Sequence, residues 1–148
     1  MPRMRYMMVD VMRVKAGQGE AFAAAWRMQV AAHQKAKMDE HWAVYDVAAG
    51  APAGTMIFLY PMTALEAMDA SGPLHGSDAF RDGVGEAGRN QMRAVNSTAL
   101  DSTQRLIFQL RADMSALPPD WAATDAFWAV KPPAPPAAPT RKPGGDNR

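Results

Sequence analysis

The sequence contains no cysteine, carries almost no net charge and has no long run of apolar residues. The absence of cysteine excludes disulfide bonds, thiolate nucleophiles and cysteine-ligated metal sites. A net charge of +1 at pH 7 over 148 residues gives no overall field that would attract nucleic acid or an anionic membrane. No stretch reaches the roughly 18 apolar residues that a transmembrane helix requires. We therefore expect neither nucleic acid nor a membrane as a partner.

The N-terminal segment also lacks the features of a secretory signal. Asp10 and Arg13 interrupt its apolar run, and no small-residue cleavage site follows. The chain as written is therefore expected to be cytoplasmic, whereas a fragment of a longer, leader-bearing protein would be secreted or periplasmic. The hydrophobic fraction of 48% and the charged fraction of 21% are typical of a globular protein, and this length suits one domain.

The sequence does contain alternating β-rich and helical patterns. The β-rich runs cover 6–14, 41–47, 55–60 and 100–111, and the helical patterns cover 20–37, 64–70 and 77–96. Residues 41–60, HWAVYDVAAGAPAGTMIFLY, predict a hairpin in the middle of the sheet, because a turn of small residues separates two β-rich segments. We expect an α+β fold of the ferredoxin-like βαββαβ type. It would have a four-stranded antiparallel sheet with helices on one face.

These strands are apolar on both faces, which predicts a partner. Near-continuous apolar runs indicate that both faces of a sheet are covered, yet the helices of this fold cover only one. The uncovered face would expose a larger contiguous apolar area than soluble monomers usually do. We therefore expect a homodimer that pairs sheet to sheet across a two-fold axis.

Three segments follow from the composition: a domain over 1–114, an aromatic latch over 115–131 and a proline-rich tail over 132–148. The latch contains Trp121, Phe127 and Trp128, which are costly to leave in water, so we expect it to pack on the domain or on a partner. An aromatic ligand clamp is the alternative. The tail has no core-forming residues and is expected to be disordered.

Two polar features have a structural interpretation. Asp10, inside the first strand, is interpreted as an edge residue or an ion-pair partner rather than a catalytic base. The glycines of residues 83–88 spell G-x-G-x-x-G, but helical, polar residues precede them instead of a strand, so no dinucleotide site is predicted. Because each glycine weakens a helix, the helical region 77–96 is expected to be loose or kinked.

The candidate ligand-binding residues are polar-tipped aromatics and histidines. His41, Tyr45 and Tyr60 lie on strands that would flank a cavity between the sheet and the helices. His41 and Tyr45 share one face of a strand, which we expect to be the helix-covered face. His33, at the margin of the first long helix, is either a boundary histidine or a ligand-binding residue. His41 with Asp39 and Glu40 offers metal-binding groups, but adjacent side chains rarely point at one ion, so no metal site is predicted.

The element order across residues 5–111 resembles that of the dimeric α/β barrel superfamily. This superfamily includes antibiotic-biosynthesis-type monooxygenases, haem-degrading enzymes, chlorite dismutase-like proteins and muconolactone isomerase-like proteins. The segments MDEHWAVYDVAAGAPAGT, LHG, DMSALPPDW and DAFW are also similar to a group of bacterial proteins that often carry a leader and two such modules in tandem. The resemblance implies that a homologous module is an alternative partner to a second copy of this chain.

The resemblance also suggests chemistry without assigning catalytic residues. Haem-binding branches use a histidine on the helical side, for which His33 and His75 are the candidates, so haem is an alternative to the expectation of no cofactor. Cofactor-free monooxygenase branches use polar or aromatic residues in the cavity where His41 and Tyr45 are expected. The main hypothesis is a protein that binds or oxidises a small aromatic or hydrophobic molecule, with catalysis left open. The alternative is a non-catalytic module that associates through its sheet.

Overall fold

A computed structural model describes residues 3–70 and 78–129 of the chain. The chain forms two compact units, Met1–Leu110 and Arg111–Arg148, each of which is described by itself. The predicted tail over 132–148 and the candidate ligand residue His75 lie outside the described residues.

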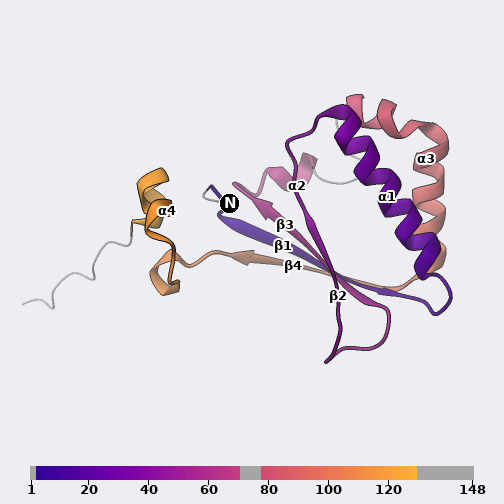
Figure 1. The fold of residues 1–148 in the computed structure, drawn as a ribbon, viewed down its shortest axis with the longest axis horizontal. Coiled ribbons are helices and arrows are strands. Elements are labelled where there is room, and N and C mark those ends of the chain that lie inside the picture. The colour runs from indigo at the N-terminus through magenta and orange to yellow at the C-terminus, as the bar shows by residue number, and fades with distance from the viewer. Residues whose placement is uncertain (1–2, 71–77, 130–148) are drawn as a thin grey trace, which may run out of the picture. The chain divides into compact units, whose positions relative to one another are not determined.

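The first unit is an α+β fold built on a four-stranded antiparallel sheet (Figure 1). Its strands are β1 (Tyr6–Val14), β2 (Ala43–Asp46), β3 (Thr55–Met62) and β4 (Leu100–Gln109). They follow the order β2-β3-β1-β4 across the sheet, which is compatible with a ferredoxin-like fold. The predicted α+β class and the four-stranded antiparallel sheet are therefore confirmed.

Two long helices, α1 (Gly19–Ala36) and α3 (Asp78–Ala99), lie on one side of this sheet, and the short helix α2 (Ala67–Ala70) follows β3 (Figure 1). Alanine-rich α1 has Glu20 in its first turn and basic residues in its last turn, which suits the helix dipole. It ends at Ala36, and the next residue, Lys37, forms a left-handed C-cap with φ of 51°. The central core cluster consists of Met12, Val14, Phe22, Phe58 and Ala99.

The glycines of residues 83–88 shape α3 and its contact with α1. Gly85, with φ of 70° and ψ of 171°, kinks the helix, as expected from the sequence. At Gly88 a Cβ atom would lie 2.8 Å from Cγ1 of Val84 in the same helix and 3.1 Å from the sulfur of Met28 on α1. Glycine at this position therefore lets the two helices approach each other closely. The G-x-G-x-x-G spacing here serves helix geometry.

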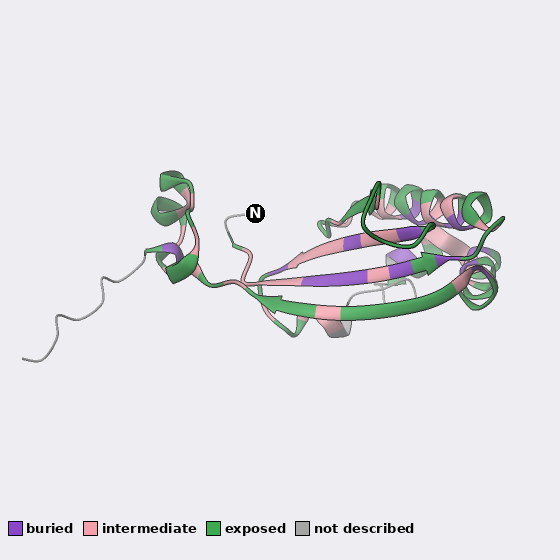
Figure 2. Cartoon of the chain, turned by 90° about the horizontal axis from the view of Figure 1, so that it is seen from below, coloured by how far each residue is buried: buried purple, intermediate pink, exposed green. Residues whose placement is uncertain are grey.

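The strands differ strongly in burial (Figure 2). Central β1 is mostly buried, whereas β4 is exposed over most of its length. β2 is a four-residue edge strand with every residue exposed, because it pairs with β3 alone. The prediction that the hairpin lies in the middle of the sheet is therefore wrong for β2. Of the two hairpin strands, only β3 occupies a central position.

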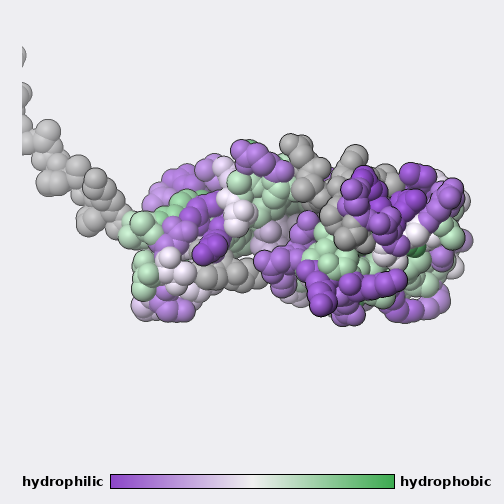
Figure 3. Space-filling model, turned by 90° about the horizontal axis from the view of Figure 1, so that it is seen from above, coloured by the Kyte–Doolittle hydropathy of each residue, from purple (hydrophilic) through white to green (hydrophobic). Residues whose placement is uncertain are grey.

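The strand register defines which side chains share a face. Phe58 of β3 lies opposite Asp10 of β1, and its ring lies 4.5 Å from that of Trp26 on α1, so this face is the helix-covered one. We call the other side the open face. Its apolar side chains include Met7, Val9, Val11, Tyr45, Ile57, Leu59, Leu106 and Phe108, and the polar residues Ser102 and Gln104 share it. Seen from above, the molecule shows hydrophobic areas among hydrophilic residues, an ordinary mixed surface (Figure 3).

Aromatic side chains form a cluster in the described part of the second unit, residues 111–129. It holds α4 (Pro119–Thr124) and two short 3-10 helices, Ala112–Met114 and Ala126–Trp128. The ring of Trp128 lies 5.0 Å from that of Trp121 and 5.0 Å from that of Phe127, and Trp128 is only 2% exposed. The Asp125 side chain accepts a hydrogen bond from the Phe127 N–H at 3.0 Å. Docking of this latch on the domain or on a partner stays a prediction.

Candidate functional site

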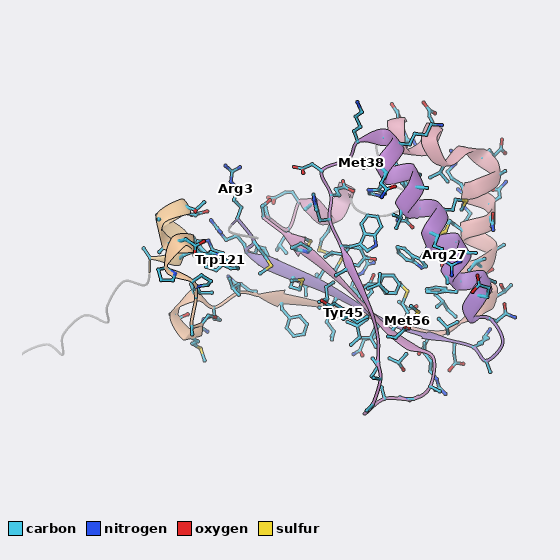
Figure 4. The ribbon with its side chains drawn as sticks, in the orientation of Figure 1. Arg3, Arg27, Met38, Tyr45, Met56 and Trp121 are labelled. Atoms are coloured by element: carbon cyan, nitrogen blue, oxygen red, sulfur yellow. The ribbon has the colours of Figure 1, made fainter. Side chains whose placement is uncertain are left out.

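An apolar groove lies between α1 and the strands β2 and β3. Its volume is about 180 Å³, and apolar atoms form its accessible wall. Figure 4 labels Arg27 and Met56, one from each wall. The lining residues are Phe22, Ala23, Trp26, Arg27, Val30, Trp42, Val44, Met56 and Phe58. Because an apolar cavity of roughly 150 Å³ can bind benzene, this groove has the size of one aromatic ring.

Helical and strand periodicity together build the groove. Phe22, Trp26 and Val30 follow one another at intervals of four residues, so they lie on one side of α1. On the opposite wall, Trp42 and Val44 are two residues apart and project the same way. The ring of Trp26 lies 6.4 Å from that of Trp42. Two tryptophans thus face each other from the helix and the edge of the sheet.

His33 packs just beyond the groove. Its ring lies 4.6 Å from the ring of Trp42 and 4.6 Å from the ring of Phe80 on α3, and both contacts are edge-on. Burial among these rings lowers the pKa of His33, so the neutral imidazole is favoured. Within residues 3–70 and 78–129, three buried side-chain atoms have no hydrogen-bond partner: His33 Nδ1, Trp26 Nε1 and Gln29 Oε1. All three belong to α1.

A buried ion pair lies on the same, helix-covered face. Asp10, only 1% exposed, accepts two hydrogen bonds of 2.7 Å from Nε and Nη2 of Arg105 on β4. Of the two interpretations offered for Asp10, the ion pair is the one found, and β1 is a central strand rather than an edge. Burial, and secondly the negative charge of Asp10, raises the pKa of Tyr60, so its phenol stays protonated.

The structure separates the predicted ligand residues. Tyr45 pairs with Ile57 on the open face and is 56% exposed. His41 precedes β2, is exposed, and has its Nδ1 2.9 Å from the Asp39 carbonyl oxygen. The prediction that both project toward the helices is therefore wrong. The physical reason is that Val44, the residue before Tyr45 on β2, pairs with inward-facing Phe58 of β3. Strand alternation then turns Tyr45 outward.

Tyr60 and His33, the other predicted residues that the structure describes, fall on the helix-covered side. Tyr60 is stacked 6.5 Å from Phe58, ring to ring, and His33 packs at the far side of Trp42. Sequence reasoning did not identify Trp42 and Gln29 as site residues. Gln29 is a polar residue within the otherwise apolar buried stripe of α1, and it is only 5% exposed. This interruption of the stripe is the feature of the sequence from which Gln29 could have been identified.

The haem alternative does not fit at His33. A ring on each side occupies the space around the imidazole, and the groove is smaller than the roughly 300–1,000 Å³ of pockets for larger ligands. Across the described residues, no group of three or more His, Asp or Glu side chains gathers closely enough to hold a metal ion.

Comparison with protein-family models, with curated proteins and with solved structures gives no match. Among the helices of residues 3–70 and 78–129, none is both long and apolar enough to cross a bilayer. The assignment of the site therefore depends on its geometry.

The first prediction concerns the buried ion pair. Removing one partner of a fully buried pair costs about 3–5 kcal/mol, because the other charge is left buried and unpaired. Arg105 is half exposed, so we expect Arg105→Met to lower the free energy of unfolding by less, on the order of 2 kcal/mol. Adding Asp10→Val should recover most of this loss. Denaturant unfolding measures both effects.

The matched control is Arg13→Met, which breaks an ion pair to Asp101 whose two side chains are each 48% exposed. Exposed pairs contribute little, so this variant should unfold nearly as the wild type does. If Arg105→Met were as mild as Arg13→Met, the buried pair would have no special role in stability.

The second prediction concerns His33 and pH. Its pKa is lowered in the folded chain, while the unfolded value is about 6.5. Below pH 6.5 the unfolded chain therefore binds a proton that the folded chain does not, and stability falls as the pH decreases toward the lowered pKa. His33→Phe, which keeps a ring between Trp42 and Phe80, should weaken this fall. Unfolding free energies at pH 7.5 and pH 5 measure it.

The difference between variant and wild type isolates His33, since Glu40, whose pKa is raised by burial, titrates in both proteins. His41→Gln, at an exposed histidine, serves as the control and should keep the wild-type pH dependence. An unchanged acid loss of stability in His33→Phe would contradict the role of His33 burial.

Proposed function

We propose that this protein binds a small hydrophobic molecule, of the size of a single aromatic ring, in the groove between α1 and β2–β3. The observation that carries the proposal is the combination of an apolar wall and a volume of about 180 Å³. Four aromatic side chains line it: Phe22, Trp26, Trp42 and Phe58. Aromatic rings gain energy from tilted and edge-on contacts, so these walls favour an aromatic ligand.

The groove supplies contact area rather than acid–base groups, so we propose binding and not catalysis. For a ligand of roughly seven or eight non-hydrogen atoms, the small buried area limits the affinity to about the millimolar-to-micromolar range. The one charged side chain on the wall, Arg27, holds Glu20 at 2.9 Å, and both side chains are largely exposed. Arg27 therefore contributes mainly its aliphatic stem to the apolar wall.

The third prediction tests the groove by filling it. Ala23 lines the groove, whereas its neighbour Ala24 is exposed on another side of α1. A ligand that binds only the folded chain raises its thermal stability by mass action. Toluene near saturation should therefore raise the melting temperature of the wild type and of Ala24→Leu, but not that of Ala23→Leu. A thermal-shift series decides this.

The same series can refute the proposal. Toluene, benzene and indole all fit the volume, so a wild type that gains stability with none of them would contradict ligand binding in the groove. Equal gains in Ala23→Leu and Ala24→Leu would place the binding elsewhere.

A second candidate function is association through the open face, and the exposure of two large side chains there favours it. Tyr45 is 56% exposed and Phe108 is 52% exposed, beside the apolar side chains of Ile57, Leu59 and Leu106. At roughly 25 cal/mol per Å², covering such a face is strongly favourable. We propose that a second copy covers it, giving a two-fold, sheet-to-sheet dimer of ferredoxin-like units that closes an α/β barrel.

The fourth prediction uses two neighbouring residues of β4 that face opposite ways. Phe108 lies opposite Met7 on the open face, and Ile107, 45% exposed, lies opposite Met8 on the helix-covered face. Sedimentation at micromolar concentration should show a dimer for the wild type and for Ile107→Glu, and a monomer for Phe108→Glu. The buried charge of the latter would oppose pairing.

A wild type that stays monomeric and soluble would contradict the dimer. A dimer that survives Phe108→Glu but not Ile107→Glu would place the interface on the other face of the sheet.

A further inference from the structure

The groove and an edge of the sheet meet at β2. Among the described residues β2 pairs with β3 alone, so its other side is an edge, and all four of its residues are exposed. Val44 of β2 and Trp42 just before it line the groove, whereas β4, at the opposite edge, contributes no lining residue. At β2 a ligand can therefore contact the groove and the backbone of an edge strand together.

The register of β2 on β3 determines which backbone groups point outward. The N–H of Val47 donates to the carbonyl oxygen of Thr55 at 3.0 Å, so these two residues form a hydrogen-bonded pair. Such pairs alternate with non-hydrogen-bonded pairs along antiparallel strands. Tyr45 therefore directs its N–H and C=O toward β3, whereas Val44 and Asp46 direct theirs away from it. The edge thus offers two donors and two acceptors to an added strand.

An extended peptide matches both features. Residues opposite each other in an antiparallel pair project their side chains to the same face of the sheet, with Cβ atoms about 5 Å apart. A peptide residue opposite Val44 would therefore direct its side chain to the face on which Val44 lines the groove. The groove has a volume of about 180 Å³, which suits one aromatic ring. When a strand is added to a sheet edge, main-chain hydrogen bonds supply affinity and side-chain pockets supply specificity.

We propose that an extended peptide adds to β2 as an antiparallel strand and places a phenylalanine side chain, opposite Val44, in the groove. This inference rests on the proposed binding function and names a partner for the same site. The wall of the groove is apolar, and its one charged residue, Arg27, is paired with Glu20. The partner is therefore recognised by its ring and its backbone, with no charged side chain required.

The test uses the capped peptide acetyl-Thr-Val-Phe-Val-Thr-amide, titrated against the full chain by calorimetry. Replacing its phenylalanine by alanine should weaken binding about tenfold, because the ring no longer fills the groove. N-methylation of the phenylalanine should also weaken binding about tenfold, because it removes the N–H that would donate to the Val44 carbonyl oxygen and adds a methyl group there. N-methylation of either valine is the matched control, because these N–H groups point away from β2.

A second pair of variants tests the edge from the side of the protein. Asp46→Pro removes an outward N–H and leaves the bonds between β2 and β3 in place, and proline is tolerated on an edge strand in this orientation. We expect it to weaken peptide binding about fivefold. Asp46→Ala, which changes only the side chain, should bind the peptide as the wild type does. Asp46 does not line the groove, so both variants should keep the thermal shift with toluene.

The toluene and peptide measurements separate the two proposals. If toluene does not stabilise the wild type, the groove proposal fails and this inference fails with it. If toluene binds but the peptide does not, the groove accepts free small molecules and the peptide inference is overturned. The inference is equally overturned if the alanine peptide or the peptide methylated at phenylalanine binds as well as the parent. The peptide series decides the matter even if Asp46→Pro does not fold.

Discussion

The packing of Phe58 against α1 is the contact on which the rest of the structure depends. Phe58 is fully buried, and its ring lies 6.2 Å from that of Phe22 and 4.5 Å from that of Trp26. Because side chains alternate along a strand, an inward Phe58 places every second residue of β3 under the helices and the others on the open face. Antiparallel pairing with β3 fixes which residues of β1 and β2 face the helices. As a result, Asp10 is buried and Tyr45 faces outward.

Most of the elements could be predicted from the sequence, but the face of β2 could not. The helix predicted at 20–37 is found at Gly19–Ala36, and the strand predicted at 6–14 is found at those residues. In the run 41–47 both alternating sets contain large apolar or aromatic residues, so periodicity gives no preference between them. The face that turns toward the helices is determined by the burial of Phe58 on the next strand, β3. The edge position of β2 likewise depends on long-range pairing that local patterns do not encode.

The candidate site shows the same division between local and distant information. The aromatic residues of α1 are visible as a helical stripe, and Gln29 is visible as its polar interruption. Whether such a residue is buried depends on how closely other elements approach α1, which is determined by features such as the missing side chain at Gly88. His41 and Tyr45 were predicted from their chemistry alone, whereas the groove is lined by two residues that lie between them in the sequence, Trp42 and Val44.

The two proposals use opposite faces of one sheet, and strand alternation keeps them separate. On β3, Met56 and Phe58 line the groove, whereas Ile57 and Leu59 belong to the open face. A partner on the open face would therefore leave the groove accessible, and a ligand in the groove would not disturb the pairing surface. The common element is the backbone of β3, which both surfaces need in one fixed register. The pairing of β3 with β1, which also holds Asp10 opposite Phe58, therefore supports both surfaces.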